Sequence, residues 1–209
     1  MFQISESENL NFEKNYENEI YHNMIGIFEQ LKKKKIKLKI FEDNRAELED
    51  TRSEFEISLG IAKEAVSPKT KLEIVLSKII FNSPDKEFEK HIKSMSPKTD
   101  PFQHKLLLKN LTTIYNILES RRLESCYGDI YKGAKDRFED ARHYYFSNQF
   151  QKNAIPNDPI EALRFARYDQ NNLVLKSDFK VAIDYISGVE LTGRKGAYDL
   201  ALMYWEKVV

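Results

Sequence analysis

The stretch that decides the fold is residues 101–120, PFQHKLLLKNLTTIYNILES, which opens on a proline and contains no glycine. Its apolar residues recur every three or four positions, which places them along one face of an α-helix. They form a wide apolar stripe: Phe102, Leu106, Leu107, Leu111, Ile114, Tyr115 and Leu118. We therefore predict a long helix over about 101–120 that packs through this stripe.

On the C-terminal side of this helix, the same periodicity predicts a series of further helices. The clearest break lies at Ile155–Pro159, where two prolines bracket Asn157 and Asp158. The expected helices cover about 122–133, 135–150, 159–170, 176–188 and 195–208.

On the N-terminal side, we predict helices over about 8–35 and 43–65. Three Ser-Pro pairs follow, at Ser67, Ser83 and Ser96. Serine caps helix N-termini and proline suits the first helical turn, so we expect helices to start at 67 and 83, and a loop at 94–101. The basic run Lys32–Lys39 alternates with apolar residues and fits a short strand, although a continued helix or a bend suits the surroundings better.

The composition favours helix throughout the chain, because glycine, at 7 of 209 residues, is scarce, and so are valine and threonine. We predict an all-α fold of about seven to nine helices. Residues 1–120 form an N-terminal helical bundle, and residues 121–209 form an antiparallel helical-hairpin array packed on it. A single domain is the alternative, since no low-complexity linker separates the halves.

Charge and cysteine content restrict the class of protein. The chain contains 33 basic residues (Lys and Arg) and 33 acidic residues (Asp and Glu). Proteins that bind nucleic acid usually have a basic domain or stripe, so this balance argues against such a function. The one cysteine, Cys126, leaves no internal disulfide. The polar, acidic start does not resemble a signal peptide, and no apolar run is long enough for a membrane span. We expect a cytoplasmic protein, or one secreted without a cleavable signal peptide into a host cell.

Three segments near the C-terminus share a pattern of an aromatic residue, an alanine three positions later and a bulky residue four positions after that. They are Phe138–Tyr145, Phe179–Ile186 and Tyr198–Trp205, with Ala141, Ala182 and Ala201 at the small position. All three positions lie on one helical face, where alanine lets a neighbouring helix approach closely. Helical hairpins of any family use the same spacing.

This pattern resembles the second helix of tetratricopeptide-type repeats. The stretch Tyr127–Tyr131 resembles the first helix of that family, and Asn157-Asp158-Pro159 its closing turn. The resemblance covers about 125–209, but the copies start 41 and then 19 residues apart (138, 179 and 198) instead of at the family's regular period. It implies a stack of helices with a concave surface for a partner protein.

Nine of the 11 tyrosines, most arginines and the only tryptophan follow residue 114. These residue types dominate the binding energy of protein interfaces, although tyrosine also fills helical cores. We predict a non-enzymatic protein-binding adaptor, and a translocated bacterial effector fits the composition. The candidate contacts are chosen by residue type and position: Tyr127, Tyr131, Arg142, Tyr145, Arg164, Arg167 and Tyr168.

Two alternatives to the adaptor remain open. Arg137 and His143 fit the Arg-x(4–6)-His motif of the all-helical HEPN ribonuclease superfamily, and the resemblance implies that both act on the RNA phosphate backbone. Phe138 departs from that family, which usually has a polar residue after the arginine. The second alternative is a structural homo-oligomer.

No cofactor or metal is expected. Glu19-x-x-His22 and Asp140-x-x-His143 are incomplete as a di-metal helical site, which requires two Glu-x-x-His pairs and two further carboxylates. The dispersed glycines form no phosphate loop.

Overall fold

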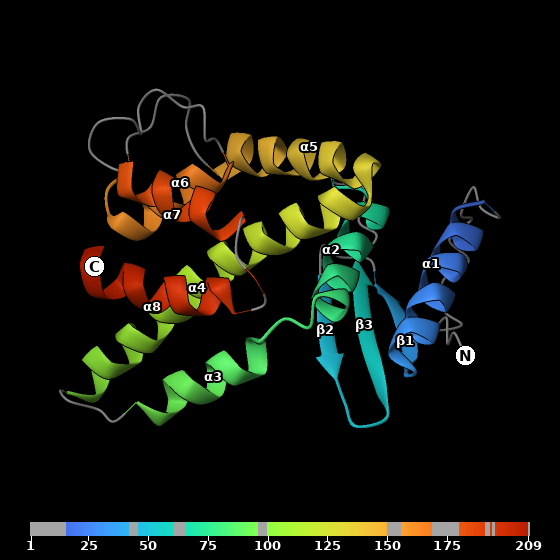
Figure 1. Ribbon diagram of the computed structural model, residues 1–209, viewed down its shortest axis with the longest axis horizontal. Helices are drawn as coiled ribbons and strands as arrows, with labels where there is room; N and C mark the ends of the chain where they lie inside the picture. The colour runs from blue at the N-terminus through green and yellow to red at the C-terminus, as the bar shows by residue number, and fades with distance from the viewer. Residues whose placement is uncertain are drawn as a thin grey trace. The chain divides into compact units, whose positions relative to one another are not determined.

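The computed structural model of the chain divides into two compact units, Met1–Ile80 and Phe81–Val209. Figure 1 traces the elements of each unit in chain order. The structure describes residues 16–41, 46–60, 66–95, 100–149, 156–168, 180–190, 193 and 195–208. Eight helices and three strands lie within these ranges. The predicted boundary at residue 120 falls within the longest of these helices.

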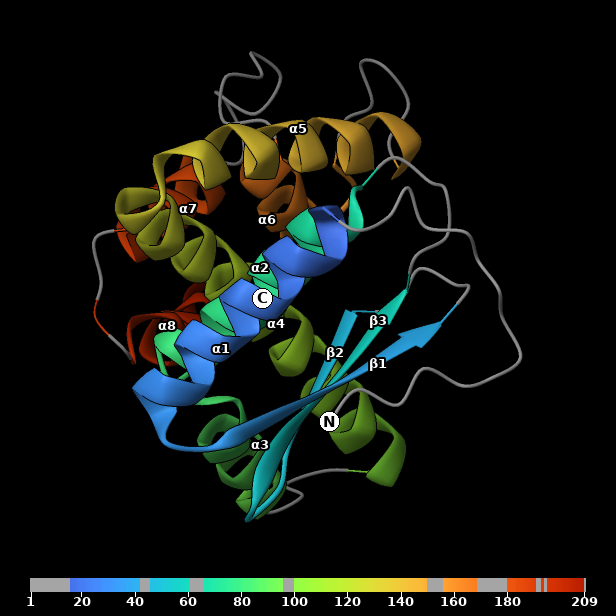
Figure 2. The ribbon, with the colours of Figure 1, turned by 90° about the vertical axis from the view of Figure 1, so that its right-hand side faces the viewer.

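The N-terminal unit combines two helices with a small sheet. Its elements are α1 (Tyr16–Lys32), β1 (Lys35–Phe41), β2 (Ala46–Asp50), β3 (Glu54–Gly60) and α2 (Pro68–Ile80). Strand β3 lies in the middle, parallel to β1 and antiparallel to β2 (Figure 2). Helix α1 contacts β1, and α2 contacts β2 and β3.

The register of the sheet separates apolar from charged residues. Leu38 lies opposite Ile57, and both side chains are buried. On the other face, the charges of neighbouring strands meet, and Lys39 forms an ion pair with Glu56. A second ion pair joins Lys34 to Asp50 of β2. The basic run is therefore partly neutralised by the acidic stretch that follows it.

The predicted helix over 43–65 is wrong, and the strand alternative for the basic run is correct. The sequences KIKLKI at 35–40 and EFEISL at 54–59 both alternate with a period of two. In a strand this period collects every apolar side chain on one face, whereas in a helix it would scatter them. The described part of the chain is therefore mostly helical with a small three-stranded sheet, so the all-α prediction is confirmed in its helical character and corrected by the sheet.

Two side-chain hydroxyls fix the chain next to the sheet, one at a predicted position and one within the segment predicted as helix. The Ser67 hydroxyl accepts a 3.1 Å hydrogen bond from the Thr70 amide, so the predicted start of α2 at 67 is confirmed. Between β2 and β3, the Thr51 hydroxyl donates to the Glu54 carbonyl at 2.7 Å and accepts from the Glu54 amide. These bonds close the connection between the two antiparallel strands.

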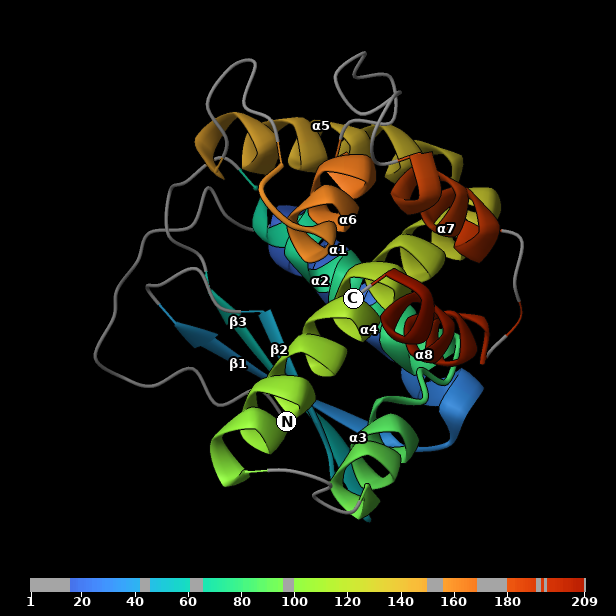
Figure 3. The same ribbon diagram turned by 90° about the vertical axis from the view of Figure 1, so that its left-hand side faces the viewer.

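In the C-terminal unit all described elements are helices, arranged around one long helix. They are α3 (Asp85–Ser94), α4 (Pro101–Ile130), α5 (Lys132–Gln149), α6 (Pro159–Tyr168), α7 (Lys180–Glu190) and α8 (Gly196–Val208). Helix α4 contacts each of the other five (Figure 3). The core of the unit gathers on it, and Leu111, Ile114 and Leu118 are fully buried.

Helix α4 contains the stretch that opened the sequence analysis, and it extends beyond the predicted end. Asp100 caps it by accepting hydrogen bonds from the amides of Phe102 and Gln103, and Pro101 stands at the first turn. No proline interrupts residues 120–130, so the two helices predicted at 101–120 and 122–133 form one helix. Of the predicted apolar stripe, Phe102 and Leu106 are exceptions, since they are 70% and 42% exposed.

The alanines of the three similar segments are all buried, as their spacing predicted. Ala141, Ala182 and Ala201 lie on α5, α7 and α8, and each of these helices contacts α4. Phe179, the first residue of the second segment, lies outside the described residues. The tetratricopeptide-like arrangement stays a prediction.

Candidate anion-binding pocket

Several charged side chains surround Glu124, a residue of α4 whose side chain is 7% exposed. Its carboxylate accepts a 2.7 Å hydrogen bond from Nη2 of Arg167 on α6. A second hydrogen bond of 3.0 Å comes from Nη1 of Arg142 on α5. Arg121, one helical turn before Glu124, approaches the same carboxylate to 3.9 Å. Three arginines from three helices thus converge on one buried carboxylate.

Local sequence explains how Arg121 and Arg167 reach this point. Arg121 and Glu124 are three residues apart on α4, so their side chains lie on the same helical face. Arg167 lies in the last turn of α6, where the helix dipole favours a cation. The Asp158 side chain accepts a 2.8 Å hydrogen bond from the Glu161 amide and fixes the start of α6.

Beside the carboxylate, a small cavity of about 100 Å³ opens between α4 and α5. Arg121, Arg142, Lys135 and Asp129 bring charge to its wall, and Phe138 is among its apolar lining residues. Gly128 brings the two helices together here, because a Cβ on it would lie 3.3 Å from Cβ of Lys135. A cavity of this size holds more than one water molecule, each of which takes about 30 Å³.

Burial and charge oppose each other in this cluster. Burial raises the pKa of Glu124, but the arginines, led by Arg167 and Arg142, outweigh burial and hold the pKa below its usual value. Burial lowers the pKa of Arg142, and the positive charges of Arg121 and Arg167 lower it further. Glu124 is therefore ionised, and its single negative charge lies among three arginines.

Positive charge exceeds negative charge around the cavity. Among the described residues that line it, three are cationic and two are acidic: Arg121, Lys135 and Arg142 against Glu124 and Asp129. Arg167 adds another cation, bound to Glu124 from α6. An anionic group that entered the cavity would meet side chains that donate from planar guanidinium groups.

The residues predicted as partner contacts divide into separate environments. Arg142 and Arg167 both bind Glu124, and Tyr168 lies 5.2 Å from the Arg167 guanidinium. Arg164 is exposed on α6. Tyr145 belongs to α5, but its side chain lies outside the described part of the structure.

The remaining two predicted contacts lie near the end of α4. Tyr127 is 2% exposed, so it supports the surface and does not form it. Its ring packs 4.6 Å from Tyr131, which is 40% exposed, and 5.8 Å from Phe138 in the cavity wall. Tyr131 lies two residues after Asp129 of the cavity wall.

Sequence reasoning missed Arg121, Glu124 and Lys135. The available signal was the pair Arg121 and Glu124 at helical spacing, but every charged helix contains such pairs. Only the packing of α5 and α6 against α4 shows that this particular glutamate is buried.

Arg137 and His143, the pair of the ribonuclease alternative, both lie on α5. Arg137 is half-buried and His143 is exposed. Six residues of ideal helix separate them by about 9 Å along the axis and about 120° around it. Neither side chain is among those that line the cavity.

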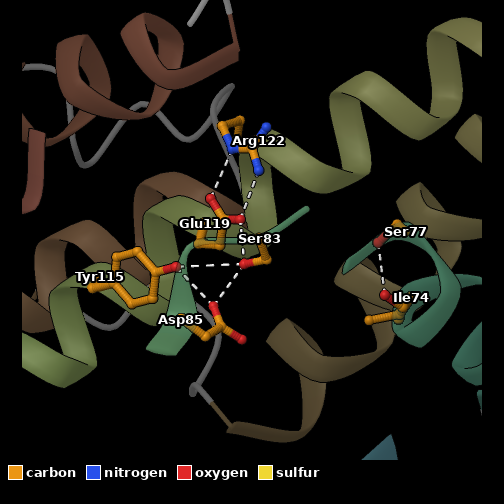
Figure 4. Close-up of polar contacts among 7 residues, drawn as sticks. All are labelled: Ile74, Ser77, Ser83, Asp85, Tyr115, Glu119 and Arg122. Atoms are coloured by element: carbon orange, nitrogen blue, oxygen red, sulfur yellow. Dashed lines mark hydrogen bonds and ion pairs between the residues drawn. The ribbon is translucent and has the colours of Figure 1, made fainter. Parts of the chain in front are cut away.

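A second polar cluster lies at the start of α3 (Figure 4). The Ser-Pro pair predicted that Ser83 would cap this helix, but its side chain does not do so. Its hydroxyl instead lies 2.6 Å from both the Asp85 and the Glu119 carboxylates. Tyr115 donates to Asp85 at 2.7 Å, and Arg122 binds Glu119 through two 2.7 Å hydrogen bonds. These bonds attach the segment before α3 to α4, which is a structural role.

The described residues contain no group of three or more His, Cys, Asp and Glu side chains that could hold a metal ion. None of the described helices combines the length and apolar character of a membrane-crossing segment. Comparison with known proteins gives no match to a family model, a curated protein or a solved structure.

Proposed function

We propose that this chain is a non-enzymatic protein-interaction module whose C-terminal unit holds an acidic segment of a partner. The observation that carries the proposal is the convergence of Arg121, Arg142 and Arg167 on Glu124 beside an open cavity. Arginines held in place lose little further freedom when they bind an anion, and this preorganisation favours affinity.

The surroundings of the cavity suit a protein partner. Tyr131 and Ile130 expose 40% and 57% of their surface at the end of α4, directly after two residues of the cavity wall. Aromatic and aliphatic side chains beside a charged pocket supply the apolar contact that protein interfaces use. Arg164 extends the positive surface on α6. The proposal includes two further points. The chain acts as an adaptor that a bacterium translocates as an effector, and its C-terminal helices form a tetratricopeptide-like stack.

The test is affinity capture with tagged protein from bacterial and eukaryotic lysates, read by mass spectrometry and a nucleic-acid stain. We expect the wild-type protein to capture a protein partner in a saturable manner. The double variant Arg121→Gln and Arg164→Gln should no longer capture it. Arg52→Gln is the matched control, because Arg52 is exposed in the turn between β2 and β3. A partner captured equally well by the double variant would contradict the proposal.

The same eluates separate the two rival functions. RNA without protein in the eluate, and RNA cleavage that His143→Ala abolishes, would establish the ribonuclease. The adaptor predicts that His143→Ala captures the partner like the wild type, since the His143 side chain is exposed and outside the cavity wall. A homo-oligomer would give only the chain itself, and light scattering would measure its mass.

A further inference from the structure

We propose that the cavity beside Arg121 and Arg142 receives the phosphoryl group of a phosphorylated peptide segment. This inference rests on the protein-binding function proposed above and names the ligand group more narrowly. It follows from the charge around the cavity, its size and the surface next to it.

The charge favours a dianion over a monoanion. Among the described residues that line the cavity, three cationic groups face the carboxylates of Glu124 and Asp129, and Arg167 binds Glu124 from α6. A phosphorylated side chain carries a charge of about −1.5 to −2 at neutral pH, whereas an aspartate or glutamate carries one negative charge. The phosphoryl group therefore compensates the excess more completely.

The geometry suits the same group. Arg121 and Arg142 both line the cavity, and both approach the Glu124 carboxylate. The two guanidinium groups are therefore held close together. Planar guanidinium forks bind phosphate oxygens through paired hydrogen bonds, a match that a lysine ammonium does not provide. The cavity volume of about 100 Å³ is large enough to accommodate a phosphoryl group.

The adjoining surface fits the peptide that would carry the group. Ile130 and Tyr131 are exposed next to Gly128 and Asp129 of the cavity wall, and Tyr131 packs on the buried Tyr127 ring. Residues flanking the phosphorylated side chain would contact this apolar surface. Burial lowers the pKa of Arg142, and the positive charges of Arg121 and Arg167 lower it further; a bound dianion would offset that repulsion.

The experiment compares binding of three degenerate peptide libraries to the full chain by fluorescence anisotropy. Their central residue is phosphoserine, glutamate or serine, and the flanking positions are identical mixtures. We expect the phosphoserine library to bind about tenfold or more tightly than the glutamate library, and inorganic phosphate to compete. The affinity should fall with added salt, because the contacts are ionic.

Variants of the wall residues test the location. Arg121→Gln should weaken phosphopeptide binding about 10- to 100-fold, and Arg121→Lys less, since it keeps the charge and loses the fork. Lys135→Gln serves as a second variant at an exposed position, in case Arg121→Gln unfolds. Asp129→Asn should tighten binding, because it removes a negative charge from the wall. Arg52→Gln is the control and should bind like the wild type.

Each outcome decides the proposal. Preference for phosphoserine that depends on Arg121 or Lys135 supports it. Equal binding of the phosphoserine and glutamate libraries overturns the phosphoryl assignment but leaves an acid-binding module. Binding of inorganic phosphate, measured by titration calorimetry, without any peptide binding also overturns it, in favour of a site for a free anion. Binding of none of the probes, together with no captured partner, would defeat both the inference and the proposed function.

Discussion

The Glu124 carboxylate on α4 accepts a hydrogen bond of 2.7 Å from Arg167 on α6, 43 residues later in the chain. The same carboxylate binds Arg142 of α5, so one acidic side chain joins three helices. Taking charges out of water costs free energy, and the hydrogen bonds offset that cost only while every partner is present.

Removing this carboxylate should therefore destabilise the C-terminal unit strongly. We expect Glu124→Ala to lower the free energy of unfolding by about 3–5 kcal/mol, because it leaves the arginine charges buried without their anion. Urea denaturation followed by circular dichroism measures the change. Glu89→Ala is the matched control, since Glu89 is 58% exposed and pairs with Lys93 on the surface of α3. A similar loss for both variants would show that Glu124 has no special role.

The acid sensitivity of the chain should also depend on Glu124. Its pKa lies below the ordinary value of 4.5 in the folded protein, because the stabilising effect of the arginines outweighs burial. The stabilisation is present above the unfolded pKa and is lost as pH falls through the folded pKa. We expect the stability difference between wild type and Glu124→Gln to shrink from about pH 6 to about pH 3. A constant difference across this range would contradict the assignment.

Ser83 should contribute to stability although it caps no helix. Its hydroxyl contacts the carboxylates of Asp85 and Glu119, which link the start of α3 to α4. We expect Ser83→Ala to lower the free energy of unfolding by about 1–3 kcal/mol, because polar groups lose a partner. The control is Ser94→Ala at the exposed end of α3, whose hydroxyl binds only a nearby carbonyl among the bonds described. Thermal unfolding of both variants provides the comparison.

The sheet predicts opposite results for two neighbouring residues of β3. Ile57 is fully buried and Ser58 lies on the other face of the strand. We expect Ile57→Ala to cost about 2–5 kcal/mol, because it leaves a cavity in the core. Ser58→Ala should change stability by no more than about 0.5 kcal/mol. A helix through this segment would not alternate in this way, so equal effects would argue against the strand.

The sequence was most informative where the local signal and the packing agree. The helical spacing of 101–120, the Ser67 cap and the buried alanines at 141, 182 and 201 all appear as predicted. At 43–65 the spacing of the apolar residues suggested helix, although β3 has the alternation of a strand. Glutamate and lysine suit helices intrinsically, but here they form ion pairs across strands, as Lys39 and Glu56 do.

By itself, therefore, the sequence determined the helical character of the segments described as α4 to α8 and the approximate start of several of these helices. Periodicity and capping act between residues a few positions apart, so they are visible in a single chain. Tertiary structure alone decided which charges are buried together. Glu124 meets Arg142 and Arg167 only because α5 and α6 pack against α4, and separations of 18 and 43 residues leave no local pattern to reveal such a contact.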